Sequence, residues 1–152
     1  MEMPLIVNQF LDRAERVYGD RVAIVDEPDQ PAESWGSLTW REVADRARAQ
    51  AAGLDRLGVG EGERVAVGSH NSARLLTSFF GVSGSGRILV PINFRLAAAE
   101  IDYIVDHCGA SVLLVDPELE DHLGAVSAPH RFTIGAVSDP ILYDFGTEPQ
   151  GW

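Results

Sequence analysis

Short apolar runs alternate with amphipathic helical segments along most of this chain. Between the runs, apolar residues recur at the i, i+3, i+4, i+7 spacing of a helix, as they do from Ile101 to Cys108. This alternation predicts an α/β fold with a largely parallel sheet, flanking helices and right-handed crossovers. The predicted strands lie at residues 22–25, 64–67, 88–90, 112–115 and 132–134.

The helix that follows Leu38 has the most complete set of local signals. Thr39 and Glu42 have the spacing of a capping box. Leu38 and Val43 occupy the positions of a hydrophobic staple around that cap. Gly58 is placed to take the left-handed conformation that ends a helix. Further helices are predicted over residues 5–18, from Asn71 or Ser72 onwards, and up to Gly109.

Two expectations concern burial around the next strand. The continuous apolar run at residues 88–90 predicts a strand buried on both faces. Pro91 has no N–H to donate, so it is expected to end the ladder. The helix before this strand is expected to turn its large residues, Leu75, Leu76, Phe79 and Phe80, toward the core.

A further helix is predicted directly after the run at residues 112–115. Asp116 can cap it, and Pro117 suits its first position. Glu118 and Glu120 would then lie near the positive end of the helix dipole. This segment continues the alternation of strand and helix.

Composition excludes several classes of protein. The chain has 152 residues, 45% of them hydrophobic and 23% charged, which is typical of a soluble globular domain. Its net charge of −11 argues against binding to nucleic acid or to anionic membranes. No apolar run approaches the roughly 18 residues of a membrane span, and no secretory signal is visible. With one cysteine and no internal disulfide, the expected location is the cytoplasm.

The domain organisation is predicted from a change in composition near the C-terminal end. Residues 1–137 are expected to form part of one domain. Residues 138–152 contain Pro140, Gly146, Pro149 and Gly151 and predict a linker or the start of a further segment.

No motif in the chain assigns a catalytic, cofactor-binding or metal-binding residue. The glycine-rich run at residues 81–86 ends a helix and precedes a strand, which is the reverse of a phosphate loop. It is therefore interpreted as a flexible helix-to-strand turn. The side chains that could bind a metal have no recognised ligand spacing; they are His70, His107, His122, His130 and Cys108.

Asn93 and Arg95 allow two interpretations. They follow a predicted parallel strand at its carboxyl end, where ligands collect in α/β proteins. They could therefore line or hinge a ligand crevice. The simpler hypothesis is that Asn93 bonds loop backbone while Arg95 pairs with a carboxylate such as Glu100. Substrate-binding residues remain unknown at this level.

The ordered set of motifs, taken together, resembles the N-terminal stretch of the AMP-forming acyl-CoA synthetases in the adenylate-forming superfamily. The segments that carry the resemblance lie at residues 10–14, 18–23, 38–43, 81–93 and 91–96. The last of them, Pro91 to Leu96, is similar to the fatty-acyl and related CoA ligases. Amino-acid-activating relatives more often have an acidic residue where Asn93 stands. Ala97 departs from the family pattern because it replaces a Ser or Thr helix cap, although Glu100 keeps the other half of that capping box.

The resemblance implies that a whole enzyme activates a fatty or related carboxylic acid with ATP and transfers it to CoA. ATP, magnesium and CoA are implied for that enzyme, with the remainder of the synthetase chain as partner and a homodimer as an open option. The family's phosphate loop and catalytic lysine are expected beyond Trp152, so this chain alone is expected to be inactive. Two alternatives stay open: a stand-alone flavodoxin-like binding or interaction domain without catalysis, and part of an amino-acid- or aryl-adenylating enzyme.

Overall fold

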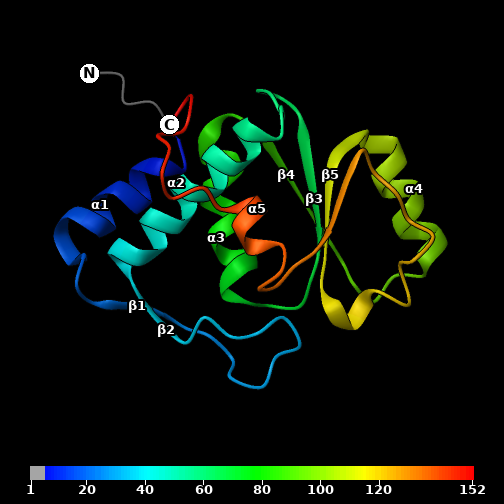
Figure 1. Ribbon diagram of the computed structural model, residues 1–152, viewed down its shortest axis with the longest axis horizontal. Coiled ribbons are helices and arrows are strands. Elements are labelled where there is room, and N and C mark those ends of the chain that lie inside the picture. The colour runs from blue at the N-terminus through cyan, green and yellow to red at the C-terminus, as the bar shows by residue number, and fades with distance from the viewer. Residues whose placement is uncertain (1–5) are drawn as a thin grey trace.

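The computed structural model describes residues 6–152, and its layers are seen in Figure 1. Helices and strands alternate along most of the chain, as the sequence predicted. The elements, in chain order, are α1 (Asn8–Tyr18), β1 (Val22–Val25), β2 (Ser37–Thr39), α2 (Trp40–Arg56), β3 (Arg64–Gly68), α3 (Ala73–Gly81), β4 (Ile88–Ile92), α4 (Ala98–Cys108), β5 (Ala110–Val115), β6 (His130–Thr133) and α5 (Asp139–Leu142). Single 3-10 turns lie at Ser83–Ser85 and Pro117–Leu119.

Four parallel strands form the central sheet in the order β4-β3-β5-β6. One face packs on α2, α3 and α5, and the other packs on α4 (Figure 1). Alternate residues of β3 explain this, because Val65 and Val67 enter the first core while Ala66 enters the second. The short antiparallel pair β1–β2 lies outside this sheet. The predicted α/β class with a largely parallel sheet is confirmed.

Helix α2 forms as its local signals predicted. The Thr39 hydroxyl accepts a hydrogen bond from the Glu42 amide at 3.3 Å, and the Glu42 carboxylate accepts one from the Thr39 amide at 2.7 Å. Both halves of the capping box are therefore present. Gly58 adopts a φ of 76°, as expected of a residue that ends a helix. Helix α1 begins at Asn8. Its predicted start at Leu5 lies outside the described residues.

The prediction for the buried side of α3 is wrong for two of its four residues. Leu76 is 45% exposed and Phe79 is 42% exposed, whereas Leu75 and Phe80 are partly buried against core clusters. The side that is buried carries Ala73, Arg74, Thr77, Ser78 and Gly81. Small residues on this side let α3 approach α2 closely. A Cβ at Gly81 would lie 2.9 Å from the Ala47 carbonyl oxygen, which is too close.

Strand β4 also differs from its prediction. It lies at one edge of the sheet and is not buried on both faces, since Ile88 is 50% exposed. Pro91 does not end the ladder: it is aligned with Val67, and the strand continues to Ile92. An edge strand bonds on one side only, so a proline whose nitrogen faces outward removes no ladder hydrogen bond.

The helix predicted after Asp116 is reduced to a single 3-10 turn at Pro117–Leu119. Asp116 does cap it, because its carboxylate accepts a hydrogen bond from the Glu118 amide at 3.0 Å. Glu120 lies beyond the turn and binds Arg131 of β6 at 2.8 Å. A long-range ion pair thus replaces the expected interaction with a helix dipole.

Residues 138–152 fold back along α2, where Figure 1 shows the orange-to-red end of the chain. The Asp144 amide donates to the Ala49 carbonyl at 2.8 Å, and Leu142 and Tyr143 enter the core. Burial, reinforced by the nearby Asp139 carboxylate, raises the pKa of the Tyr143 phenol well above its usual value. The domain boundary after residue 137 stays a prediction. Within residues 6–152, no helix is both long enough and apolar enough to cross a bilayer.

Candidate functional site

The topology points to one place on the sheet where a ligand would be expected. Among the strands of the parallel sheet, β3 comes first in the chain, with β4 on one side of it and β5 on the other. The strand order therefore reverses between β3 and β5. In open parallel sheets, ligands bind outside the carboxyl ends of the strands at such a switch point. The residues that follow Gly68 and Val115 are consequently the first to consider.

Ser69 and Asp116 occupy this switch point and are both almost fully buried. The Ser69 hydroxyl lies 3.3 Å from Asp116 Oδ2 and 2.8 Å from the His70 carbonyl oxygen. The Asp116 amide donates to the Gly68 carbonyl at 2.8 Å. The other oxygen of Asp116 accepts a hydrogen bond from the Glu118 amide. The polar groups at the ends of β3 and β5 therefore bind one another. The sequence had assigned Asp116 only its capping role.

A group of surface side chains lies beside the switch point. His70 Nε2 lies 3.1 Å from a Glu118 carboxylate oxygen. The His70 ring is 4.1 Å from the ring of Phe94, and the Arg95 guanidinium lies 5.1 Å from that same ring. Residues after three different strands are thus brought together. This open group can donate and accept hydrogen bonds, and it carries charges of both signs.

The two interpretations of Asn93 and Arg95 can now be compared with the structure. Asn93 Oδ1 accepts a hydrogen bond from the Arg95 amide at 3.1 Å, so the loop-backbone hypothesis is confirmed for Asn93. The expected pairing of Arg95 with Glu100 is wrong. The Glu100 carboxylate instead accepts from the Ala97 amide at 2.8 Å, and the Arg95 guanidinium stacks on Phe94. Glu100 thereby retains its half of the capping box.

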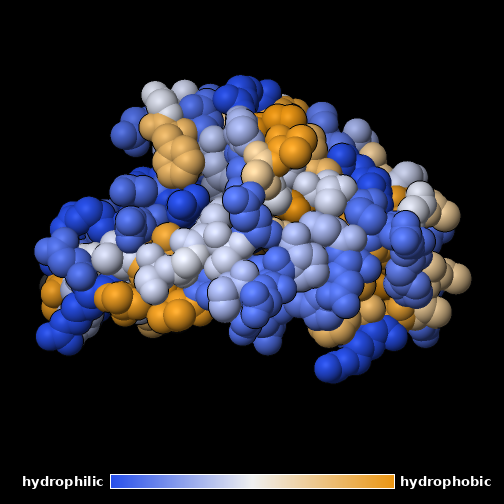
Figure 2. All heavy atoms as spheres, turned by 60° about the horizontal axis from the view of Figure 1, so that its bottom comes forward, coloured by the Kyte–Doolittle hydropathy of each residue, from blue (hydrophilic) through white to orange (hydrophobic). Residues whose placement is uncertain are grey.

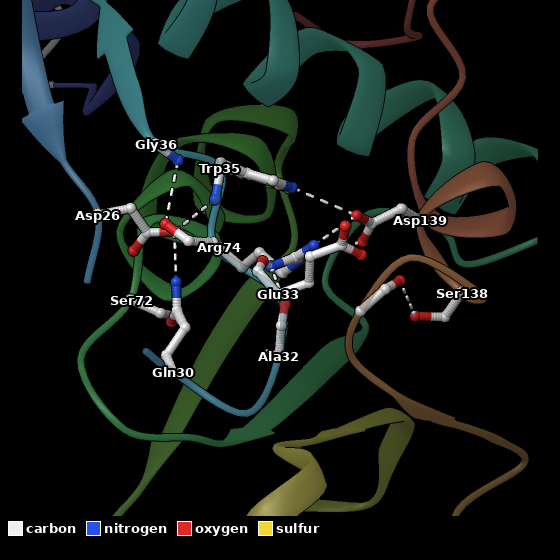
Figure 3. Close-up of polar contacts among 12 residues, drawn as sticks. Asp26, Gln30, Ala32, Glu33, Trp35, Gly36, Ser72, Arg74, Ser138 and Asp139 are labelled. Carbon is white, nitrogen blue, oxygen red and sulfur yellow. Dashed lines mark hydrogen bonds and ion pairs between the residues drawn. The ribbon is translucent and has the colours of Figure 1, made fainter. Parts of the chain in front are cut away.

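A buried polar network around Arg74 was not found from the sequence. Its guanidinium binds both oxygens of Asp139, at 3.1 and 2.7 Å, and also the Ala32 and Glu33 carbonyls (Figure 3). The indole N–H of Trp35 donates to the same Asp139 at 3.3 Å, and Arg74 lies 4.5 Å from the Trp35 ring. Every interaction of this group fixes the loop at residues 26–36 and the start of α5. The network is therefore structural.

The same loop is anchored at its other end by Asp26, which is buried. Its carboxylate accepts from the Ala73 amide at 2.8 Å and from the Trp35 amide at 2.9 Å. The amide of Gln30 also donates to it (Figure 3). Asp26 thus joins the loop to the first turn of α3. The only sequence signal was a loop composition, which does not identify these partners.

The glycine-rich turn does not fit a nucleotide phosphate. Its Ser85 and Arg87 amides both donate to the Val82 carbonyl, at 3.3 and 3.2 Å. Its Gly84 carbonyl accepts from the Asn8 side chain at 2.7 Å, and a Cβ at Gly84 would overlap that side chain. The helix-to-strand turn is confirmed, and these hydrogen bonds join it to its neighbours. Its expected flexibility stays a prediction.

The candidate metal ligands are dispersed. His107 stacks on Tyr103, His122 contacts the Leu96 carbonyl, and Cys108 is a partly buried free thiol on α4. Across residues 6–152, His, Cys, Asp and Glu side chains do not form a group of three that could hold a metal ion. All twelve basic residues of the chain are arginine. Because the His, Cys, Asp and Glu side chains of residues 6–152 form no such group, we assign no ligand for magnesium among them.

Comparison with known proteins shows which family this chain matches. The family model described as "AMP-binding enzyme" matches residues 11–151. A long-chain-fatty-acid–CoA ligase of Thermus thermophilus is 38% identical over 119 residues, which is 78% of this chain and 21% of that protein. A 4-hydroxybutyrate–CoA ligase of Metallosphaera sedula is 32% identical over 131 residues, which is 86% of this chain and 23% of that protein.

A solved structure of a CoA ligase is also similar to this chain. The crystal structure of a long-chain-fatty-acid-CoA ligase from Archaeoglobus fulgidus superposes with a TM-score of 0.84 and 26% identity. The match covers 99% of this chain and 32% of that one. The chain thus spans less than a quarter of the length of the two curated relatives. Because the family model covers nearly all of the sequence, this chain belongs to the AMP-binding enzyme family of adenylate-forming enzymes, to which it is matched over residues 11–151.

Proposed function

We propose that this chain is the N-terminal part of an AMP-forming acyl-CoA synthetase. The observation that carries the proposal is the match of residues 11–151 to the AMP-binding enzyme family together with similarity to several acid–CoA ligases. In such a reaction the carboxylate of the acid attacks the α-phosphate of ATP and releases pyrophosphate. The thiol of CoA then displaces AMP from the acyl-adenylate. This chain supplies sheet and packing surfaces for that enzyme.

The proposed substrate is a fatty or related carboxylic acid. Relatives of this chain are named for long-chain and medium-chain fatty acids and for 4-hydroxybutyrate, which supports an acid of this class. Magnesium and CoA are required by the whole enzyme and are bound by residues outside this chain. Residues 1–137 belong to its large N-terminal domain, and residues 138–152 lead into the next segment. The whole enzyme is cytoplasmic and is open to homodimer formation.

The test uses the whole polypeptide that contains this sequence. It is supplied with ATP, magnesium, CoA and a panel of acids: 4-hydroxybutyrate, medium- and long-chain fatty acids, and an aromatic acid. Pyrophosphate release and acyl-CoA mass are measured together. We expect release that depends on an aliphatic acid, with a matching thioester. A folded whole polypeptide that releases no pyrophosphate with any acid would contradict the proposal.

The isolated chain of 152 residues provides the second half of the test. It contains no lysine, and its glycine-rich turn at residues 81–86 does not fit a phosphate, so it is expected to catalyse no ATP–pyrophosphate exchange. Exchange by the purified chain, retained after a further purification step, would show that the adenylation site lies within these residues. That result would contradict the assignment of the chemistry to the rest of the enzyme.

A further inference from the structure

Helix α1 has apolar side chains on two sides, and one of these sides is open to solvent. Phe10 is 72% exposed, Val17 is 54% exposed, and Ile6, which precedes the helix, is 51% exposed. On the opposite side, Leu11 is fully buried in a cluster that includes Val43 of α2. The fold of residues 6–152 therefore uses only the inner side of α1. Large apolar side chains grouped on an exposed helix side are typical of a contact surface.

The exposed side chains of α1 have the arrangement of a helix contact surface. Residues three or four positions apart lie side by side along a helix, which is the spacing of Ile6, Phe10, Arg13 and Val17. This row borders a hollow of about 430 Å³ on the helix surface. Six residues that line the hollow form what we call the α1 face: Ile6, Phe10, Asp12, Arg13, Arg16 and Val17. A row of side chains beside a hollow is the kind of surface against which a second helix packs.

Helix α1 lies at one end of the molecule. Figure 1 shows it in blue at the left end of the longest axis, beyond α2 and away from the central sheet. Figure 2 is turned about the horizontal axis, and its left end shows hydrophilic and hydrophobic atoms side by side. A mixed surface of this kind suits a contact that combines apolar packing with polar pairs.

The charges of the α1 face are not used within the described chain. Glu15, on the inner side of α1, is bound by Arg48 of α2 at 2.9 Å. Within residues 6–152, by contrast, Asp12 and Arg16 of the α1 face take part in no ion pair. One negative and one positive side chain on the same surface are therefore available to a partner.

The α1 face is complementary in charge to a second copy of itself. Helix α1 has two acidic and two arginine side chains, so it is locally neutral although the chain has a net charge of −11. If two α1 helices pack antiparallel about a two-fold axis, with Phe10 beside Val17 of the other copy, Asp12 comes close to Arg16 of the other copy. Each contact occurs twice in such an arrangement. Repulsion between the more distant acidic residues is screened beyond about 8 Å at physiological salt.

We propose that the α1 face is a homodimer contact, occupied by α1 of a second copy of this chain in antiparallel orientation. The proposal names a contact for the homodimer that the proposed function leaves open, and it requires neither ligase activity nor any substrate. Phe10 and Val17 are the apolar anchors of the contact, because they are its most exposed apolar side chains. Asp12 and Arg16 set the antiparallel orientation. A single pair of helices makes a small interface, so the dimer is weak and reversible.

The test exchanges charges across the proposed contact in this chain. Asp12→Arg brings arginines together across the two-fold axis, and Arg16→Asp brings aspartates together. Each variant alone should associate at least about tenfold more weakly than the parent chain, because like charges then face one another. A mixture of the two variants should recover association, because every opposite-charge pair is formed again between the two chains. The double variant Asp12→Arg with Arg16→Asp should recover association by itself.

The apolar part of the contact is tested by Phe10→Ser, which should weaken association by at least about tenfold. Tyr103→Ser is the matched control, because Tyr103 is a 65% exposed aromatic residue on α4. It should change association by less than about twofold. Urea unfolding of every variant separates loss of association from loss of fold.

Sedimentation equilibrium over a range of concentrations measures the association. The buffer contains a reductant, because Cys108 is a free thiol that could cross-link two chains. The mass of the parent chain should rise with concentration from 16.5 kDa toward twice that value.

A parent chain that stays monomeric at millimolar concentration would overturn the proposal. Association that is unchanged in both charge variants and in Phe10→Ser would also overturn it. A monomeric chain that binds vesicles of phosphatidylcholine and phosphatidylglycerol, and loses this binding with Phe10→Ser, would overturn it in favour of a membrane surface. None of these results affects the synthetase assignment, which depends on pyrophosphate release. A dimer without acid-dependent pyrophosphate release would contradict that assignment and leave the α1 contact intact.

Discussion

Helix α3 packs small and polar residues against α2, while its larger apolar residues Leu76 and Phe79 face outward. The inner side owes its stability to close approach and to the buried ion pair of Arg74. The outer side has exposed apolar surface and no partner among residues 6–152. The difference teaches that hydrophobicity alone does not determine which side of a helix faces the core. Space for the backbone, set here by Gly81, can decide it.

The largest effect is expected on the inner side, at Arg74. Its side chain is 3% exposed and is paired with Asp139 at 2.7 Å. Arg74→Met leaves that carboxylate and two loop carbonyls without their partner, so the free energy of unfolding should fall by about 3 kcal/mol or more. Urea unfolding measures the loss. The control is Arg41→Met, an exposed pair with Asp20, which should cost less than about 1 kcal/mol. Similar losses of unfolding free energy in both variants would show that the buried ion pair contributes no more than the exposed one.

The next effect tests the close approach of the two helices. Gly81→Ala places a Cβ 2.9 Å from the Ala47 carbonyl oxygen and closer still to the Gln50 amide oxygen. Alanine gains about 1 kcal/mol of helix propensity, but overpacking should outweigh it and leave a net loss of about 1–2 kcal/mol.

Gly60→Ala is the matched control for Gly81→Ala, because its nearest contact would be an ordinary 3.4 Å to Glu63. It should change the free energy of unfolding by less than about 0.5 kcal/mol. Thermal and urea unfolding of both variants make the comparison. If Gly81→Ala were as stable as the parent chain, the two helices would have room to shift, and Gly81 would not fix the orientation of α3.

A smaller effect is expected where α1 meets α2. Arg48 binds Glu15 at 2.9 Å and, through this hydrogen bond, lowers the pKa of the Glu15 carboxyl below its usual value. A lowered folded-state pKa gives stability that is present above the unfolded pKa and is lost as pH falls through the folded one. Glu15→Gln should therefore cost up to about 1 kcal/mol at pH 7 and progressively less below about pH 4. A cost that stays constant down to pH 2 would exclude the ion pair as its cause.

A similarly small effect per residue is expected on the outer side of α3. Leu76 and Phe79 are 45% and 42% exposed, so Leu76→Ser and Phe79→Ser should each cost the isolated chain only about 1 kcal/mol. Its solubility should rise, and its binding of an apolar dye should fall. Dye fluorescence and urea unfolding measure these results. A loss comparable with that of Arg74→Met would mean that the outer residues belong to the core.

Local chemistry explains which parts of the fold could be predicted. The capping box of Thr39 and Glu42 is complete within four residues, and the buried strand β5 is recognisable from its continuous apolar run. Strand order could not be predicted, because pairing brings together residues far apart in sequence. Pro91 illustrates this, since its effect on the ladder depends on whether β4 is central or at the edge.

The candidate site was predicted less completely for the same reason. Asn93 was placed correctly as a loop residue after a strand, but Ser69 and His70 meet Asp116 and Glu118 only because β3 and β5 are neighbours. Arg74 and Asp139 are 65 positions apart, so no motif could link them. One signal was available for α3: Ala73, Thr77 and Gly81 recur every four residues, which is the pattern of a closely packed helix side.

The measurement that tests the two sides of α3 most directly is hydroxyl-radical footprinting of this chain. Oxidation is quantified by mass spectrometry at Leu76 and Phe79 on the outer side and at Leu54 in the core, which is 1% exposed. We predict that Leu76 and Phe79 are oxidised while Leu54 is protected. Protection of Leu76 and Phe79 to the same extent as Leu54 would contradict the account.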